Sequence, residues 1–315
     1  MSKVYITDYV DNPNIEKDVL GEDLGPELNE DTEVIIVWHE HITKEYIDKL
    51  PNLKGIVRYG VGYDAIDLEY AKSKNIYVCN TPDYGTEEVS DTSIAMIMNI
   101  ARGITRYDYQ CRAYRDNWQE NTITSIKRNS DYKLGVIGAG RIGGSVILKA
   151  NALRFQTHFF DPYVVRGHEK MLNATRVETL DELLSTCDII SINCPLSKET
   201  NGMIDESFIS KMKDGASLVN TARGGIIKDI DVFYEPLKTG KLSNVAVDVI
   251  PHEPPKDSLL INSWRLREEW LDGRFILNPH TAYYSDKAYF EMRNKAATNA
   301  KRILEGVTPY NIVNL

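Results

Sequence analysis

The chain has 315 residues, a length that suits two domains better than one. Apolar residues make up 42% of it, and no run approaches the ~20 consecutive apolar residues that cross a bilayer. The formal net charge is −9, with acidic and basic residues mixed along the chain, which argues against a nucleic-acid partner. The first ten residues lack the basic and apolar regions of a secretory signal. We therefore expect a cytoplasmic protein with no membrane partner.

The first 95 or so residues alternate short apolar runs with helical patterns. We expect a short strand within residues 1–10 and buried strands at 33–38, 55–58 and 76–79. Strands that alternate with helices predict a parallel sheet with helices on both faces. Four cysteines without metal or CxxC spacing are expected to be small core residues: Cys79, Cys111, Cys187 and Cys194.

The middle of the chain predicts one long helix from about Glu87 to Arg115, with Ile94, Met98 and Ile104 spaced for burial. A polar connecting arm is expected over 118–130. A second α/β unit should run from Tyr132 to about His280. The last helix is expected over 286–305, with Gly306 as its C-cap.

A glycine-rich turn lies inside a complete strand–turn–helix–strand pattern. A strand at 133–137 leads into Gly138-Ala-Gly140-Arg-Ile-Gly143, a helix follows to about Leu153, and a strand at 157–160 ends on Asp161. In such a unit the first glycine permits a tight turn, the second lets the backbone approach a pyrophosphate, and the third allows helix and strand to pack closely. The helix N-terminus favours phosphate.

Asp161 lies 23 residues after Gly138, where a carboxylate accepts the adenosine ribose hydroxyls and repels a 2′-phosphate. The pattern therefore predicts NAD as the cofactor in preference to NADP. Arg166 is close in sequence and leaves NADP open.

Three later segments place Arg223, Glu253 and His280 in loops that follow predicted strands at 216–220, 244–249 and 275–277. Loops after the carboxyl ends of parallel strands converge on the ligand-binding crevice. A planar guanidinium binds both the carboxylate and the ketone of a 2-oxo acid. A histidine can donate the proton that an alkoxide needs, and a neighbouring glutamate favours and orients the protonated imidazole. Each residue alone has an ordinary structural explanation, but together they predict hydride transfer to a 2-oxo acid.

The segments NTARGG, DVIPHEPP and NPHTA resemble the signatures of the D-isomer-specific 2-hydroxyacid dehydrogenase family, and RYGVGYDAID resembles its substrate loop. This resemblance runs over almost the whole chain. It implies Arg223, Glu253 and His280 as the catalytic residues and Asp248 beside the nicotinamide. It also implies that Gly60, Val61 and Gly62 present backbone N–H groups to the substrate carboxylate.

The family resemblance implies an α/β fold with two doubly wound parallel-sheet domains. A Rossmann-type NAD-binding domain at 99–285 would be inserted in a flavodoxin-like substrate domain formed by 1–98 and the helix at 286–315. The active site would lie in the cleft between the domains, and a homodimer would form through the NAD domain. The candidate cofactor-binding residues are Gly138, Gly140, Arg141, Ile142, Gly143, Asp161, Cys194, Pro195, Thr200, Thr221, Ala222, Asp248 and His280.

Within the family, residues 63–67, 161–163 and 280–285 are most similar to the C-terminal-binding-protein branch, which includes NAD-sensing transcriptional corepressors. There an Arg that matches Arg58 and a Trp that matches Tyr283 line the substrate pocket. The candidate substrate-binding residues are therefore Arg58, Tyr59, Gly60, Val61, Gly62 and Tyr283. The substrate side chain is left open, as is the role of the long segment 256–274.

Three alternatives accompany the dehydrogenase hypothesis. An NAD-sensing oligomeric binding protein would share the fold, although it need not retain the catalytic Arg, Glu and His. An oxidoreductase acting on an inorganic or phosphonate acid would share the motifs. A metal site at His39 and His41 is not predicted, because no third ligand follows at a useful spacing.

Overall fold

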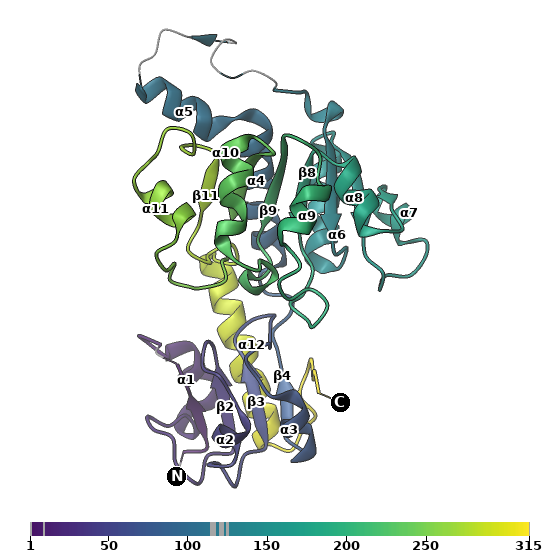
Figure 1. Cartoon of the computed structure of the whole chain (residues 1–315). Helices are drawn as coiled ribbons and strands as arrows, with labels where there is room; N and C mark the ends of the chain where they lie inside the picture. The colour runs from purple at the N-terminus through teal and green to yellow at the C-terminus, as the bar shows by residue number, and fades with distance from the viewer. Residues whose placement is uncertain (1, 9, 114–117, 120–122, 124–125, 315) are drawn as a thin grey trace. The chain divides into compact units, whose positions relative to one another are not determined.

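The computed structural model describes residues 2–8, 10–113, 118–119, 123 and 126–314, and it contains two compact units (Figure 1). Unit 1 comprises Met1–Gly85 and Tyr284–Leu315, and unit 2 comprises Thr86–Tyr283. The divisions thus follow residues 85 and 283, whereas the sequence suggested 98 and 285. The earlier start of unit 2 has a physical reason: helix α4 (Thr86–Arg102) buries Met96, Ile97 and Ile100 in the core of that unit.

Unit 1 is built on a parallel four-stranded sheet in the order β1-β2-β3-β4. The strands are β1 (Val4–Ile6), β2 (Val34–Val37), β3 (Gly55–Arg58) and β4 (Tyr77–Cys79). Leu24 makes a further parallel bridge to Val4, on the edge of β1 that does not face β2. Counting that bridge as a strand gives the order 2-1-3-4-5, which is the flavodoxin-like order.

Helices cover both faces of this sheet because β2 is apolar on both sides. Val34 and Ile36 pack in one core with residues of α1 (Asn14–Leu20) and α12 (Asp286–Leu304). Ile35 and Val37 pack in a second core with residues of α2 (Lys44–Ile47) and α3 (Leu68–Ser73). The C-terminal helix α12 is therefore part of unit 1, as Figure 1 shows.

Unit 2 contains a parallel seven-stranded sheet in the order β11-β10-β9-β8-β5-β6-β7. Its strands are β5 (Lys133–Ile137), β6 (Gln156–Phe160), β7 (Thr175–Arg176), β8 (Ile189–Ile192), β9 (Ala216–Asn220), β10 (Leu242–Val247) and β11 (Phe275–Leu277). The strand order reverses between β5 and β8. In open α/β sheets, ligands bind outside the carboxyl ends of the strands at such a reversal.

The helices of unit 2 form two layers. On one face, α4 and α6 (Arg141–Ala152) pack against alternate residues of the central strands. On the other face lie α8 (Leu180–Thr186), α9 (Glu206–Lys211), α10 (Tyr234–Thr239) and α11 (Leu259–Arg265). Helix α7 (His168–Leu172) adds Leu172 to the core that α6 covers, whereas none of the described side chains of α5 (Ile104–Ala113) is buried.

The long helix expected at 87–115 is two helices. Gly103, with a φ of 64°, ends α4 in a left-handed conformation, and α5 begins at Ile104. This break turns Ile104 out of the apolar stripe, so that its side chain is 59% exposed instead of buried. Ile94 and Met98 are partly buried against the core. The expected helix end at Arg115 lies outside the described residues, as do residues 120–122 and 124–125 of the expected arm at 118–130.

Two further expectations require correction. The strand expected at 244–249 spans 242–247, and its register with β9 shifts between Leu242 and Asn244. Cys111 is exposed on α5, whereas the other three cysteines are buried as expected. Burial raises the pKa of Cys79 and Cys187 to about 12 and that of Cys194 to about 11.

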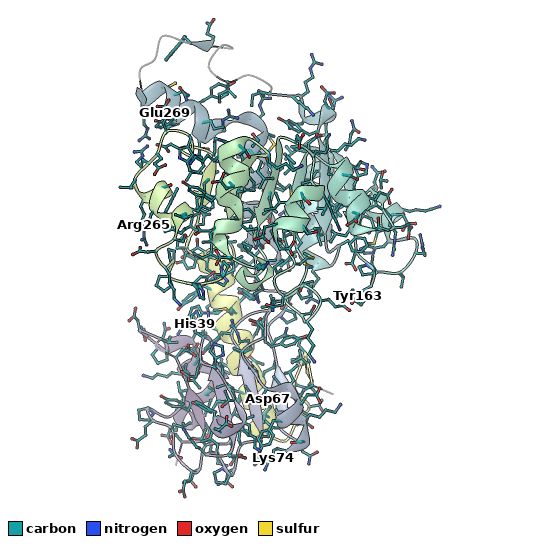
Figure 2. All side chains as sticks on the ribbon, viewed as in Figure 1. His39, Asp67, Lys74, Tyr163, Arg265 and Glu269 are labelled. Atoms are coloured by element: carbon teal, nitrogen blue, oxygen red, sulfur yellow. The ribbon has the colours of Figure 1, made fainter. Side chains whose placement is uncertain are left out.

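The long segment 256–274 extends the core of unit 2. Leu260, Ile261 and Leu271 are buried, and Trp264 contacts Phe275 edge-to-face at a centroid distance of 6.1 Å. Arg265, labelled in Figure 2, lies on the exposed side of α11 and forms an ion pair with Asp257. Among the described residues, no helix is long and apolar enough to cross a membrane.

Candidate active site

Three neighbouring strands of unit 2 deliver the three predicted catalytic residues to one edge of the sheet. Arg223 follows β9, Glu253 follows β10 and His280 follows β11, and the three strands pair in parallel. Their carboxyl ends therefore meet at the same edge. The sequence motifs and the sheet order agree on this placement.

Glu253 holds the imidazole of His280. The Nδ1 atom of His280 lies 2.7 Å from Oε2 of Glu253, and the other carboxylate oxygen accepts the N–H of Ile250 at 3.0 Å. The carboxylate is thus anchored by one oxygen and orients the ring with the other. With Nδ1 facing a carboxylate, Nε2 is the ring nitrogen left to exchange a proton with a ligand.

The charge of Glu253 is set by competing effects. Burial alone would raise the pKa of this carboxyl, but the hydrogen bond and charge of His280, the N–H of Ile250 and the charge of Arg223 outweigh it and lower the pKa. Glu253 is therefore an ionised hydrogen-bond acceptor at neutral pH.

His280 itself has an unusual backbone, with a φ of 57°. Asp248 stabilises this conformation, because its carbonyl oxygen accepts the N–H of His280 at 2.8 Å and its two carboxylate oxygens accept the N–H groups of Thr281 and Ala282 at 2.9 and 3.0 Å. Asp248 is only 2% exposed, and burial raises its pKa. The family resemblance predicts Asp248 beside the nicotinamide; the structure adds that Asp248 supports the His280 turn.

Arg223 is held by a compact loop. Its Nη1 donates to the carbonyl of Ala222 at 2.7 Å, and the Asn220 side chain bonds the main chain of Ala222 and Arg223. A Cβ atom at Gly224 would lie 1.9 Å from the carbonyl oxygen of Ile250. Glycine at 224 therefore lets the Arg223 loop touch the loop that carries Glu253.

In the glycine turn after β5, main-chain atoms approach one another more closely than a residue with a side chain would permit. Gly138 has a φ of 87°, and a Cβ there would lie 2.8 Å from the Cys194 nitrogen. A Cβ at Gly143 would lie 1.9 Å from the Gly138 carbonyl oxygen, whereas nothing lies within 4 Å of a Cβ at Gly140. The turn and the first helical residues thus pack against each other and against the loop after β8, and Gly140 faces open space, where a pyrophosphate can approach.

Helix α6 begins at Arg141, and its N-cap Gly140 supplies no side-chain acceptor. Within the part of the chain that the structure describes, no acceptor takes the N–H groups of Gly140, Arg141 or Ile142. Orphan N–H groups at a helix N-terminus bind phosphate. The donor set therefore fits the pyrophosphate of a dinucleotide.

Asp161 ends β6, and it also closes the turn. Its Oδ2 accepts the N–H of Ala139 at 2.8 Å and its Oδ1 accepts the N–H of Tyr163 at 2.9 Å. Each oxygen retains a lone pair for a ribose hydroxyl. Arg166, which left NADP open, pairs with both oxygens of Glu178 at 2.6 and 2.9 Å. Tyr163 is 76% exposed at the surface of unit 2 (Figure 2).

The remaining cofactor candidates lie on the loops after β8 and β9. Cys194 is buried against the glycine turn, and Thr200 donates from Oγ1 to the carbonyl of Pro195 at 2.6 Å. Thr221 is buried, with its hydroxyl 2.6 Å from that of Ser93 on α4. Ser93 carried no signal in the sequence, because its partner is 128 positions away.

The predicted substrate loop lies in unit 1, after β3, and one of its three N–H groups is already used. The N–H of Gly60 donates to Oγ1 of Thr81 at 2.6 Å, and the Gly60 carbonyl accepts from the Thr81 N–H at 3.0 Å. Among the described residues, no acceptor takes the N–H of Val61 or Gly62. The expectation of three available donors is therefore corrected to two.

Tyr59 also differs from its expected role as a pocket residue. Its side chain is 1% exposed and lies in the core of unit 1, so that it is not available to line a substrate pocket. Arg58 and Tyr283 are partly buried, each in its own unit.

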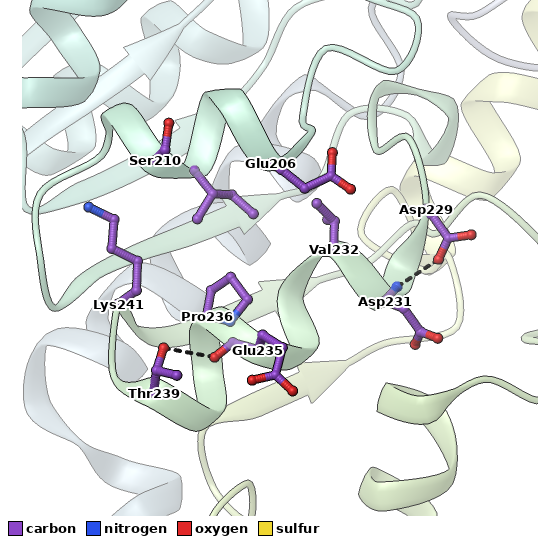
Figure 3. A pocket seen from close by; sticks show the side chains of 10 residues that line it. Glu206, Ser210, Asp229, Asp231, Val232, Glu235, Pro236, Thr239 and Lys241 are labelled. Carbon is purple, nitrogen blue, oxygen red and sulfur yellow. Dashed lines mark hydrogen bonds between the residues drawn. The ribbon is translucent and has the colours of Figure 1, made fainter.

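A surface pocket elsewhere in unit 2 does not involve these residues. It lies between α9 and α10 and is lined by acidic side chains, including Glu206, Asp229 and Glu235, above an apolar floor (Figure 3). None of the three predicted catalytic residues lines it. Among the described residues, no group of three or more His, Cys, Asp or Glu side chains could hold a metal ion.

Comparison with known proteins agrees with this geometry. Residues 94–282 match the sequence profile of the D-isomer-specific 2-hydroxyacid dehydrogenase NAD-binding domain. The chain is 33% identical over 286 residues to D-3-phosphoglycerate dehydrogenase of Methanocaldococcus jannaschii, covering 90% of the chain and 52% of that protein. It is 30% identical over 295 residues to C-terminal-binding protein 1 of Caenorhabditis elegans, covering 91% of the chain and 39% of that protein. The chain thus spans about half or less of these two relatives.

A solved structure matches over nearly the full length of both chains. The D-lactate dehydrogenase of Aquifex aeolicus, in complex with NAD and lactic acid, superposes with a TM-score of 0.85 at 29% identity, covering 97% of this chain and 96% of that one.

Proposed function

The chain belongs to the D-isomer-specific 2-hydroxyacid dehydrogenase family, and we propose that it interconverts a small 2-oxo acid and the corresponding D-2-hydroxy acid with NAD as cofactor. The observation that carries the proposal is the 2.7 Å contact between His280 and an ionised Glu253, on the strand edge that also bears Arg223. Nicotinamide, when bound, supplies or accepts the hydride.

The chain's own residues provide the other requirements of the reaction. Arg223 binds the substrate carboxylate and polarises the ketone, because a guanidinium offers paired donors. His280 donates the proton from Nε2 to the developing alkoxide and takes it back in the oxidation direction. Glu253 orients the ring through Nδ1 and stabilises its charged form. In unit 1, the N–H groups of Val61 and Gly62 bind the substrate carboxylate.

Cofactor choice follows from the turn after β5. Gly138, Gly140 and Gly143 admit the pyrophosphate, with the α6 N–H groups as donors. The Asp161 carboxylate accepts ribose hydroxyls and repels a 2′-phosphate, and Arg166 is paired with Glu178. We therefore infer a preference for NADH over NADPH. We also propose a homodimer formed through unit 2 and a cytoplasmic location.

Consumption of NADH by the purified protein with a panel of 2-oxo acids tests the activity. The panel contains glyoxylate, pyruvate, hydroxypyruvate, branched and aromatic 2-oxo acids, the methionine-derived acid and phosphonopyruvate. We expect turnover of at least one member and a fall in kcat of at least ~100-fold in His280→Ala. His252→Ala is the matched control, because His252 is exposed next to Glu253 and should leave the rate within about twofold.

A second candidate function is supported by the similarity to the C-terminal-binding protein. In that case the chain binds NAD(H) to control its oligomeric state and catalyses no turnover. Arg223→Gln separates the two: an enzyme loses turnover while still binding NADH. If the wild-type protein binds NADH tightly and turns over no acid in the panel, the sensor replaces the enzyme.

A further inference from the structure

A buried charge pair in unit 1 adjoins the predicted substrate loop. Glu16 on α1 is fully buried, and Arg293 on α12 is 5% exposed. Arg293 donates from Nε to Oε1 of Glu16 at 2.8 Å, from Nη2 to Oε2 at 2.5 Å, and from Nη2 to the carbonyl of Asn12 at 2.6 Å. The two helices are thus joined by a forked ion pair inside the core.

Tyr59 connects this pair to the loop. Its hydroxyl donates to Oε1 of Glu16 at 2.6 Å, and its backbone directly precedes Gly60. Burial and the neighbouring Glu16 charge raise the pKa of Tyr59 far above its ordinary value, so that the hydroxyl keeps its proton and remains a donor. The ring also packs edge-on against Trp38 at a centroid distance of 6.0 Å.

Stability alone is a weak explanation for such a network. A buried ion pair loses the hydration of both charges, and apolar side chains of similar volume usually stabilise a core equally well or better. The pair instead holds the Glu16 carboxylate in one position, where it accepts a hydrogen bond from the Tyr59 hydroxyl. That position is the end of the Tyr59 side chain, one residue before Gly60, which has a φ of 124°.

The loop is held from its other side as well. Gly60 exchanges two hydrogen bonds with Thr81, and Nδ2 of Asn80 donates to the carbonyl of Val61 at 2.7 Å. The Tyr59 N–H bonds the carbonyl of Val37 on β2 at 2.8 Å. With these groups fixed, the peptide planes that carry the N–H groups of Val61 and Gly62 have a defined direction.

We propose that Glu16, Arg293 and Tyr59 form a positioning network that aims the Val61 and Gly62 N–H groups at the substrate carboxylate. The inference rests on the proposed function, which assigns those two groups to the carboxylate. The three residues do not touch the reacting atoms. They act through the backbone, so the network sets how well the acid binds and leaves proton and hydride transfer to unit 2.

Tyr59→Phe tests the network by removing one hydroxyl while leaving Glu16 paired with Arg293. A loop that binds the carboxylate equally in the ground and transition states affects KM and leaves kcat unchanged. We expect the KM for the 2-oxo acid to rise about tenfold, with kcat and the KM for NADH within about twofold. Arg293→Lys keeps the positive charge but cannot form the paired hydrogen bonds to the two Glu16 oxygens, and it should raise the KM for the 2-oxo acid.

Tyr70→Phe is the matched control. The hydroxyl of Tyr70 on α3 also donates to a carboxylate of unit 1, that of Asp48, but no described hydrogen bond joins this hydroxyl to residues 58–63. Its KM values should match those of the wild-type protein. A Tyr59→Phe enzyme with an unchanged KM, or with a lowered kcat and an unchanged KM, would overturn the positioning role.

Amide hydrogen exchange of the 58–63 segment gives a readout that does not need turnover. We expect exchange at the hydrogen-bonded amides of Tyr59 and Gly60 to be about tenfold faster in Tyr59→Phe and unchanged in Tyr70→Phe. If the wild-type protein turns over no 2-oxo acid, the proposed function fails, and exchange alone decides whether the network fixes the loop. If turnover is present but both KM and exchange are unaltered, the network proposal fails and the proposed function stands.

Discussion

At the scale of single residues, the conformation of His280 depends on one carboxylate. A φ of 57° is uncommon for residues other than glycine, although asparagine, aspartate and histidine adopt it more often than the rest. Asp248 compensates by accepting three N–H groups from residues 280–282, one at its carbonyl and two at its carboxylate. The direction of the imidazole is therefore set by Asp248 through the backbone and by Glu253 through the ring.

Asp248→Asn should lower kcat, because the amide NH2 cannot accept the second N–H and the turn shifts. A misplacement of a reacting group by about 1 Å costs on the order of 100-fold in rate, and we expect a loss of that size. Initial rates at saturating NADH measure it. Asp231→Asn is the control, since Asp231 likewise accepts two backbone N–H groups, those of Leu259 and Leu260, outside the site. Equal kcat values for the two variants would contradict this role of Asp248.

At the scale of elements, a partly buried carboxylate joins the amino ends of three central strands. Asp188 precedes β8, its main chain bonds Lys133 and Ser217 at the starts of β5 and β9, and its Oδ2 accepts the Lys133 N–H at 2.9 Å. Its Oδ1 contacts the ammonium groups of Lys213 and Lys127 at 2.5 and 3.1 Å. Burial alone would raise its pKa, but these donors lower it below the ordinary value.

This shift predicts a pH-dependent contribution to stability. A carboxyl whose pKa is lowered by folding stabilises the fold above its unfolded pKa of about 3.9, and the contribution is lost as the pH falls further. Asp188→Asn should therefore destabilise the protein by about 2 kcal/mol at pH 7, and the difference from the wild-type protein should shrink below about pH 4. Urea unfolding at pH 7 and pH 3.5 measures it. A difference that stays constant between the two pH values would refute the assignment.

At the scale of the whole molecule, the chain folds into two units with separate cores, and unit 2 alone carries the glycine turn. A ligand at 100 times its Kd stabilises the domain that binds it by about 2.7 kcal/mol. Calorimetry should therefore show two transitions, with NADH raising only the transition of unit 2, by about 5–10 °C.

Gly143→Ala provides the control for this assignment. Its Cβ would meet the Gly138 carbonyl oxygen, so the variant should lower the transition of unit 2 and abolish its response to NADH. A single transition that NADH shifts as a whole would show instead that the two units unfold together.

Short sequence patterns were enough to predict the parallel α/β class, the glycine turn and the loops that carry Arg223, Glu253 and His280, because apolar runs become strands and these residues lie in the loops that follow them. The strands at 55–58, 133–137 and 275–277 follow such runs without a shift. Local propensity could not reveal that Gly103 breaks the long helix, nor that Ile104 turns outward, since a glycine is also compatible with a continuous helix.

Contacts between residues far apart in the sequence could not be predicted from local patterns, because they depend on how the chain packs. The Thr81 hydroxyl accepts the Gly60 N–H, and the hydroxyls of Ser93 and Thr221 form a hydrogen bond. Arg293 pairs with Glu16, from which it is separated by 277 positions in the sequence. These pairs form because parallel strands and α12 bring the segments together. Packing also explains why Tyr59 does not line the expected pocket. A tyrosine suits a binding surface, but its position after β3 buries this one against Glu16. Such burial depends on the packed core and could not be predicted from the residue type.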